Sequence, residues 1–180
     1  MQLAADGDQE AFAELVSRHI DSLYGYARRL CYNDTMAEDL VQDTWLAAWQ
    51  HAQRYRPEKS AVSTWLHRIL HNRFIDHTRR RATRTEHSGS ATDMPATALE
   101  IATLEASAQE QARQLEQAQM VARLDQCLGE LPEQQRAAVT LTHLQGFSNR
   151  DVAHILGLSV RATESLLARA RRTLRERFSE

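Results

Sequence analysis

The side chains able to do chemistry in this chain favour binding over catalysis. His67 and His71 stand four residues apart, the spacing of a two-histidine metal site, but no HExxH glutamate and no third ligand accompany them. We therefore expect two histidines on a polar helix face, with no metal and no other cofactor. No nucleophile motif, glycine-rich phosphate loop or catalytic carboxylate pair is evident, so we expect no enzyme. A small helical enzyme that uses the two histidines is the alternative, and it would lose activity on their substitution.

Arginine is the side chain that the sequence supplies in unusual number. Of the 22 basic residues 21 are Arg and only Lys59 is Lys, against 24 acidic residues and a net charge of -2. A near-neutral total argues against a general polyanion binder. The arginine excess has two explanations: codon usage in a GC-rich genome, and the fit of the guanidinium group to phosphate and guanine.

The charge is far from uniform along the chain. Residues 1–56 carry 9 acids and 5 bases, and residues 88–133 carry 8 acids and 2 bases. Residues 57–87 carry 3 acids and 7 bases, and residues 134–180 carry 4 acids and 8 bases. Two basic blocks are thus separated by an acidic one, which predicts two nucleic-acid contacts joined by a region that avoids phosphate.

Helices must position these residues. Six Gly and three Pro leave few turns, and apolar residues recur at three- and four-residue spacing, which predicts an all-α fold. We expect two small helical domains, residues 1–87 and 116–180, joined by a partly helical linker over residues 88–115. No signal peptide, no apolar run long enough to cross a bilayer and no cysteine motif is evident, which predicts a soluble cytoplasmic protein.

The first predicted domain has three helices and a cationic loop. One helix covers residues 8–30, a second begins at a capping box formed by Thr35 and Glu38, and a third runs from Ser63. The polar residues early in the second helix form either an ordinary solvated face or a docking surface for a basic partner. They are Glu38, Asp39, Gln42 and Asp43.

The loop over residues 52–63 mixes cations with the ring of Tyr55. That mixture suits unpaired bases, because rings stack on any base and cations hold the backbone. A plain surface loop with a half-buried tyrosine is the alternative. The third helix ends in four arginines within six residues, more than the helix dipole needs, which indicates phosphate contact. These are Arg79, Arg80, Arg81 and Arg84.

The second predicted domain carries the more informative pattern. Ser148 and Asp151 form a capping box for a short helix. In the turn over residues 157–159, Gly takes a left-handed position, Leu plugs the core and Ser caps the next helix. An arginine-rich helix over residues 160–178 follows, so the pattern predicts a helix-turn-helix, although a helical hairpin without DNA has the same apolar pattern.

In a helix-turn-helix the start of the second helix reads base edges in the major groove. The residues expected to contact DNA there are Ser159, Arg161, Ala162, Thr163, Ser165, Arg169 and Arg172.

The two halves together resemble a known family. Region 2 of bacterial sigma factors is resembled by two stretches of the first predicted domain. These are residues 38–45 with Trp49, and residues 64–69 with Asn72, Asp76, Arg79 and Arg80. Residues 131–132, 146–148, 152–159 and 168–171 resemble region 4. Both modules in this order are similar to the extracytoplasmic-function (ECF, group 4) sigma factors of the sigma-70 family, over everything except most of the linker.

The resemblance implies a sigma factor that directs core RNA polymerase to promoters and starts transcription in a stress or envelope response, under an anti-sigma factor. Region 2 implies docking on the β′ clamp through Asp39, Gln42 and Asp43, whose acidity suits a basic partner. Region 4 implies contact with the β flap and with the -35 element. No small-molecule substrate and no membrane insertion are implied.

The resemblance also implies a set of side chains that open the -10 element and hold a flipped base. Stacking and phosphate contacts can offset the unstacking of that base without hydrolysis. These residues are Arg54, Tyr55, Arg56, Lys59, Asn72, Arg73, Arg79, Arg80 and Arg81.

One departure from the family concerns the -35 reader. Glu164 and Leu166 stand where many relatives have basic residues. A glutamate accepts from cytosine N4 but repels phosphate, and Leu166 packs either on a thymine methyl group or on the protein itself. The alternative function is a stand-alone helix-turn-helix regulator, which would bind duplex DNA unaided and would not need the acidic face of the second helix.

Overall fold

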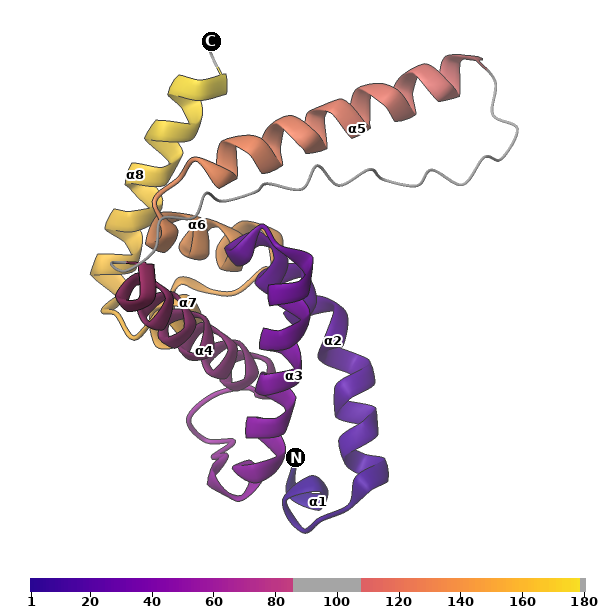
Figure 1. Cartoon of the computed structure of the whole chain (residues 1–180), viewed down its shortest axis with the longest axis vertical. Coiled ribbons are helices and arrows are strands. Elements are labelled where there is room, and N and C mark those ends of the chain that lie inside the picture. Colours follow the sequence, from indigo (N-terminus) through magenta and orange to yellow (C-terminus); the bar gives the residue numbers. More distant parts are fainter. Residues whose placement is uncertain (86–107, 179–180) are drawn as a thin grey trace.

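The structure, a computed structural model, describes residues 1–85 and 108–178, and in these ranges the chain is built of helices joined by turns and loops, with no strand (Figure 1). The predicted all-α class is confirmed. No helix within these ranges is long and apolar enough to cross a membrane. The helices are α1 (Gln2–Ala5), α2 (Gln9–Cys31), α3 (Asp34–Gln50), a 3-10 turn (Ala52–Arg54), α4 (Val62–Thr85), α5 (Ala108–Gly129), α6 (Glu133–Val139), a π-helical turn (Thr140–Leu144), α7 (Asn149–Leu156) and α8 (Val160–Phe178).

Helices α1 to α4 form the N-terminal unit, residues 1–85. The side chain of Asp8 caps α2 by accepting from the amide of Ala11 at 2.9 Å. One turn later the ring of Phe12 meets Trp45 and Trp49 of α3 edge-on, with centroid distances of 5.7 and 4.8 Å. Edge-to-face pairs are favoured beyond the area that they bury, so they hold the start of α2 to the end of α3.

Helix α3 begins earlier than the sequence indicates. The predicted capping box at Thr35 and Glu38 is wrong, because Asn33 caps the helix by accepting from the amide of Met36 at 2.8 Å. Tyr32 adopts a left-handed conformation with φ 49°, which turns the chain from α2 into α3. Two polar residues competed for one helix start, and Asn is among the strongest N-cap residues.

Helices α5 to α8 form the C-terminal unit, residues 108–178. Helix α5 projects from the body (Figure 1), and it makes residues 108–115 of the predicted linker helical. The other linker residues up to 107 lie outside the described residues. Helix α6 continues through its π-helical turn to Gly146, whose φ of 73° ends it.

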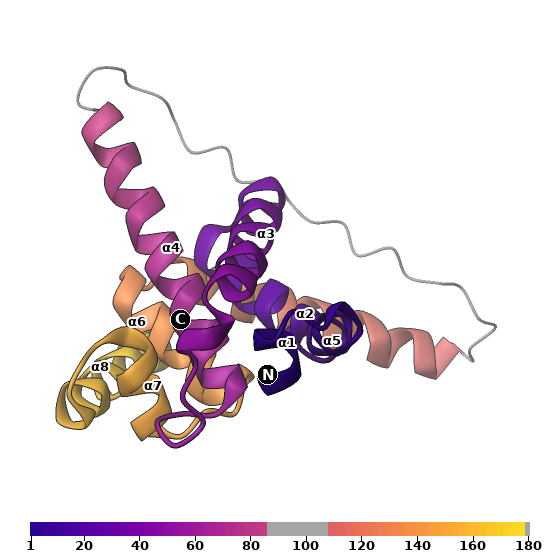
Figure 2. The same ribbon diagram turned by 90° about the horizontal axis from the view of Figure 1, so that it is seen from below.

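The two units share one interior. Helix α4 packs against α7 and helix α2 packs against α6, so the C-terminal unit lies beside α4 (Figure 2). Domains of this size bury little surface alone, and each therefore gains stability from the other. The predicted domain boundaries at residues 87 and 115 stay predictions. The shared core includes Leu23, Leu66 and Leu70 from one unit and Leu141, Val152 and Ile155 from the other.

His67 and His71 lie inside this core, so their predicted place on a polar face is wrong. Their exposed fractions are 0% and 6%. Nδ1 of His67 lies 2.8 Å from the carbonyl oxygen of Ser63, and the Tyr26 hydroxyl lies 3.0 Å from Nδ1 of His71. No group of three or more metal-binding side chains occurs in the described ranges. Burial lowers the pKa of both histidines to about 4, so both are neutral at pH 7.

The buried histidines predict a loss of stability in mild acid. Their pKa values are about 4 in the folded chain and 6.5 when exposed, so the unfolded chain binds more protons between these values. The contribution of the two histidines to the free energy of unfolding is therefore fully present above pH 6.5. It falls between pH 6.5 and 4, by up to about 3 kcal/mol for each histidine. Urea unfolding at a series of pH values measures this loss.

The control is an exposed histidine of the same protein. His67→Gln should weaken the pH dependence, because glutamine does not titrate, whereas His143→Gln should keep it unchanged. The same pH dependence in the wild type and in His67→Gln would contradict the assignment.

Candidate nucleic-acid interface

Helices α7 and α8 form the predicted helix-turn-helix, and each of its signals is met. The Ser148 hydroxyl accepts from the amide of Asp151 at 3.2 Å and starts α7. Gly157 ends α7 with φ 67°, and the amide of Leu158 returns to the carbonyl of Ala153 at 2.9 Å. The turn is therefore fixed by its own hydrogen bonds before it meets any partner.

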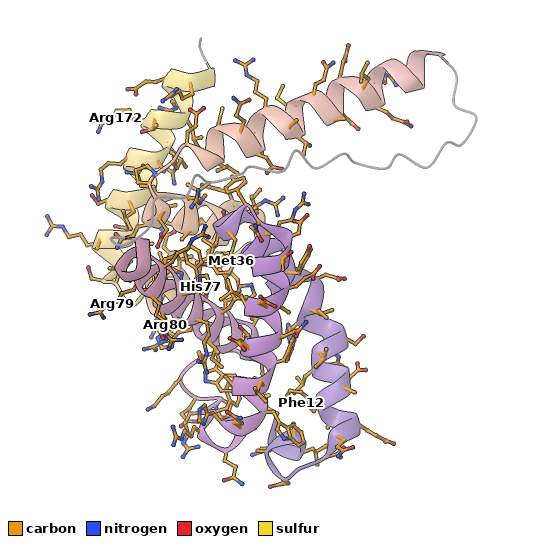
Figure 3. The ribbon with its side chains drawn as sticks, in the orientation of Figure 1. Phe12, Met36, His77, Arg79, Arg80 and Arg172 are labelled. Atoms are coloured by element: carbon orange, nitrogen blue, oxygen red, sulfur yellow. The ribbon has the colours of Figure 1, made fainter. Side chains whose placement is uncertain are left out.

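The outer face of α8 presents polar side chains to solvent. Ser159 caps the start of α8, because its hydroxyl accepts from the amide of Ala162 at 3.2 Å. Figure 3 shows Arg172 further along the same helix, with its side chain directed outward. The exposed residues of the predicted -35 set are Ser159, Arg161, Ser165, Arg169 and Arg172, with Ala162 half-buried and Glu164 exposed beside them.

Thr163 is the exception in that set. Its exposed fraction is 0%, and its hydroxyl donates to the carbonyl of Ser159 at 3.2 Å. Its predicted contact with a base edge is therefore wrong, because the methyl group completes the core and the hydroxyl is used within the helix. Leu166 is 6% exposed and belongs to the hydrophobic core. Of the two alternatives for this residue, it therefore packs on the protein and not on a thymine methyl group.

The acidic face of α3 borders a groove between α3 and α4, named here the α3–α4 groove. The predicted docking residues Asp39, Gln42 and Asp43 are all exposed along one wall. The other wall comes from α4 and includes Arg73 and Arg80, which the sequence assigned to the -10 element. Figure 3 places Arg80 and His77 on this part of α4 and Met36 on α3. Residues predicted for two partners thus meet in one groove.

Tyr55 fixes the cationic loop between α3 and α4 through a hydrogen bond to the loop backbone and a ring contact with α4. The Tyr55 hydroxyl donates to the carbonyl of Ser60 at 2.9 Å, and its ring lies 5.4 Å from that of Trp65. Arg54, Arg56 and Lys59 remain exposed around it. Helix α1 adds to this site, because Met1, Gln2 and Ala5 line a hollow with Tyr55, Arg56 and Val62. No motif in residues 1–5 indicated that contribution.

The residues predicted for the -10 element do not form one patch. The loop stands at the start of α4, whereas Arg79 and Arg81 are exposed near its end, about 25 Å away at 1.5 Å per residue. Asn72 is exposed between them, and Arg73 and Arg80 line the α3–α4 groove. A single base could contact only the loop, so the remaining arginines suit the backbone of a longer stretch.

The structure has two helical units. One carries a complete helix-turn-helix, and the other carries an acidic helix face and a cationic loop. This combination defines a two-module helical transcription factor. The Sigma-70 region 2 family model matches residues 15–84, and the Sigma-70, region 4 model matches residues 122–174. The RNA polymerase sigma factor CnrH of Cupriavidus metallidurans is 36% identical over 177 residues, covering 95% of this chain and 88% of CnrH.

Two solved structures share the fold over nearly the whole chain. CnrH in complex with the cytosolic domain of CnrY matches with a TM-score of 0.69 and 31% identity, over 99% of this chain and 94% of that one. The sigma factor RpoE in complex with the anti-sigma factor NepR from Bartonella quintana matches with a TM-score of 0.75 and 26% identity, over 94% and 98%.

The chain belongs to the ECF group of the sigma-70 family. It is therefore an RNA polymerase sigma factor, and the alternative of a stand-alone regulator is set aside. Sigma factors bind core RNA polymerase and promoter DNA through regions 2 and 4, and they are transcription initiation factors without enzymatic activity of their own.

The left-handed turn before α8 yields a stability prediction. Gly157→Ala should lower the free energy of unfolding by about 1 kcal/mol, because alanine is strained at this positive φ. Nothing lies within 4 Å of the added Cβ, so the backbone strain alone is measured. Urea unfolding at pH 7 gives the difference from the wild type.

Gly25→Ala is the matched control, since Gly25 lies inside α2 and an added Cβ meets ordinary contacts at 3.6 Å. It should raise the free energy of unfolding by about 0.5–1 kcal/mol, because alanine is the better helix former. If Gly157→Ala left the free energy of unfolding unchanged or raised it, the turn would not require glycine.

Proposed function

We propose that the two units divide a promoter between them. Residues 1–87 dock on core polymerase and open the -10 element, residues 116–180 read the -35 element as duplex, and residues 88–115 connect them. The observation that carries the proposal is the capped recognition helix, which turns Arg161, Glu164 and Ser165 outward while Thr163, one position away, is buried. That face can enter a major groove without unfolding any part of the unit.

The exposed side chains of Asp39, Gln42 and Asp43 are the proposed contact with the coiled coil of the β′ clamp. They lie on one wall of the α3–α4 groove, accessible to a helix of opposite charge. Electrostatic attraction of this kind steers association and weakens with salt. The C-terminal unit is proposed to contact the β flap.

The cationic loop is proposed to hold a flipped base of the -10 element. The ring of Tyr55 is half-buried and anchored through its hydroxyl, so it offers a fixed stacking surface, with Arg54, Arg56 and Lys59 exposed for the backbone. Phosphates further along the melted strand are assigned to the arginines of α4, with Asn72 between. These are Arg73, Arg79, Arg80 and Arg81.

Readout of the -35 element is assigned to the exposed face of α8. Arg161 is proposed to donate to a guanine and Glu164 to accept from the N4 amine of a cytosine. Ser159, Ala162 and Ser165 border these two, and Arg169 and Arg172 are assigned to phosphates.

An anti-sigma factor is the proposed regulator, in a stress or envelope response. RpoE was solved with the anti-sigma factor NepR and CnrH with the cytosolic domain of CnrY, and this chain matches both sigma factors over more than nine tenths of its length. A cytoplasmic location and the absence of catalytic activity are part of the same proposal.

The docking surface can be tested by a double substitution. Gln42→Ala with Asp43→Ala should weaken binding to core polymerase by about ten-fold, equivalent to about 1.4 kcal/mol, because an amide and a charge facing the partner are lost. Titration of labelled chain with core polymerase at two salt concentrations gives the dissociation constants.

The matched control is Ser17→Ala with Asp21→Ala, which removes one polar group and one charge from the exposed side of α2. That variant should bind as the wild type does. Equal affinities of the two double variants for core polymerase would contradict the assignment of the docking surface.

The -35 reader can be tested by selecting randomised promoters with the reconstituted holoenzyme. Arg161→Ala should cost ~1–3 kcal/mol on the preferred sequence and relax the choice at one base pair, because a base contact is lost. Glu164→Gln should shift the preference at its position from cytosine to adenine, since glutamine pairs with adenine in the major groove. Arg172→Ala is the comparison and should weaken binding uniformly across sequences. Uniform weakening by Arg161→Ala would make it a phosphate contact instead.

A further inference from the structure

A large apolar side chain is exposed at the start of the recognition helix α8. Val160, the first residue of this helix, is 43% exposed. Among residues 149–177, whose side chains the structure describes, it is the one large hydrophobic side chain that is exposed. The leucines on either side of the turn, Leu156 and Leu158, are half-buried and pack against the hydrophobic core. The apolar surface of Val160 is instead available to a partner.

Val160 shares one side of α8 with Glu164. Residues four apart in a helix are neighbours on its surface, with Cβ atoms about 5–6 Å apart. Glu164 is exposed and is the proposed acceptor from the N4 amine of a cytosine. Ser159 caps the helix ahead of both residues, so the backbone that carries them is ordered before DNA binds. An acceptor and an apolar group are thereby presented side by side at the end of the helix that enters the major groove.

The major-groove edge of a pyrimidine offers the matching pair of groups. Cytosine presents its N4 amine there, and thymine presents O4 and a methyl group on C5. C5 is bonded to the ring carbon that carries the amine. A side chain beside the acceptor of N4 therefore lies next to the C5 position of the same base or of its stacked neighbour. Apolar side chains are the groups that proteins use against a methyl group at this position.

Valine suits this contact because its shape is fixed. A β-branched side chain has one strongly preferred rotamer in a helix, so little conformational entropy is lost when its methyl groups are covered. Covering them with a methyl group of the base removes apolar area of both partners from water. The contact consequently favours a pyrimidine that carries the methyl group over the same pyrimidine without it.

We propose that Val160 is a specificity-determining residue that recognises the C5-methyl group of a pyrimidine in the -35 element. The inference rests on the proposed readout of that element by α8, and it adds one base group to those assigned to Arg161 and Glu164. Leu166, the candidate from the sequence for such a contact, is buried, and Val160 takes this role. The methyl group belongs to a thymine or to a 5-methylcytosine, which carry it at the same place. In the second case, methylation of the cytosine that Glu164 reads strengthens promoter binding, since the N4 amine is retained.

Base analogues that differ by this one methyl group test the contact directly. The reconstituted holoenzyme is titrated with duplexes of its preferred promoter in which one thymine of the -35 element at a time is replaced by uracil. In a second series one cytosine at a time is replaced by 5-methylcytosine. We expect a loss of about four-fold in affinity at one uracil, which identifies a thymine, or a gain of about four-fold at one 5-methylcytosine, which identifies a methylated cytosine.

A valine substitution shows whether Val160 makes the contact. Val160→Ala should bring the ratio of the two affinities to about one, because alanine lacks the methyl groups that reach the base. A purely structural role of Val160 would weaken binding to both duplexes by the same factor. Val121→Ala is the matched control, since Val121 is 55% exposed on α5, to which no DNA contact is assigned, and this variant should keep the wild-type ratio. Circular dichroism checks that the helices are retained.

The proposal is overturned if no uracil and no 5-methylcytosine changes the affinity of the wild type, or if the change persists in Val160→Ala. The wild-type comparison requires no substituted protein, so it decides the matter even if a variant fails to fold. Arg161→Ala on the same duplexes separates this inference from the proposed function. Weaker binding by Arg161→Ala without any methyl dependence would keep α8 as the reader and remove Val160 from it. Unchanged binding by both variants would contradict the proposed readout and this inference together.

Discussion

The packing of one helical unit against the other is the interaction on which the rest of the structure depends. One side chain of the C-terminal unit, Arg136 of α6, completes the end of α2 and the end of its neighbour α5. Arg136 donates to the carbonyl of Gly129 and to that of Leu30 at 3.1 Å, and the Tyr32 hydroxyl donates to the carbonyl of Asp125 at 2.8 Å. Carbonyls in the last turn of a helix lack an intrahelical partner, so these bonds satisfy the ends of both α2 and α5.

The same interface explains why two histidines are buried. A polar ring in a core must be hydrogen-bonded, and His67 and His71 find partners in Ser63 and Tyr26 within their own unit. The C-terminal unit then covers His67 through the ring of Phe147. The interface is consequently specific in its register, because a shift of one unit along the other would separate the Gln145 amide from Ser22 and Nε2 of His154 from Arg68.

Much of the fold was predictable because the local signals agree with one another. The cap at Ser148, the left-handed Gly157 and the arginine-rich α8 each point to the same helix-turn-helix. The failures at His67, His71 and Thr163 have a common physical origin, which is that polarity in a sequence does not report burial. Thr163 is polar and reads as a surface residue, yet its hydroxyl bonds within the helix and leaves a methyl group for the core.

The sites were predictable only as lists of residues. The exposed acids of α3 and the arginines of α4 were identifiable from charge and spacing, but their meeting in the α3–α4 groove depends on how two helices cross. The contribution of α1 to the hollow beside Tyr55 arises from a long-range contact with no motif. The contact between Ser22 and Gln145 is the clearest case, because both are ordinary polar residues until the fold brings them together.

The charge distribution along the chain limits the expected attraction of the free chain to bulk DNA. The net charge of -2 divides into +4 in each of residues 57–87 and 134–180, with the acids concentrated elsewhere. A weak attraction to bulk DNA would favour promoter reading in the polymerase-bound state. Transcription of total genomic DNA by purified core polymerase, with RNA 5′ ends mapped, tests this most directly. We predict discrete start sites that share upstream elements only when the chain is present, and unchanged 5′ ends with and without the chain would contradict it.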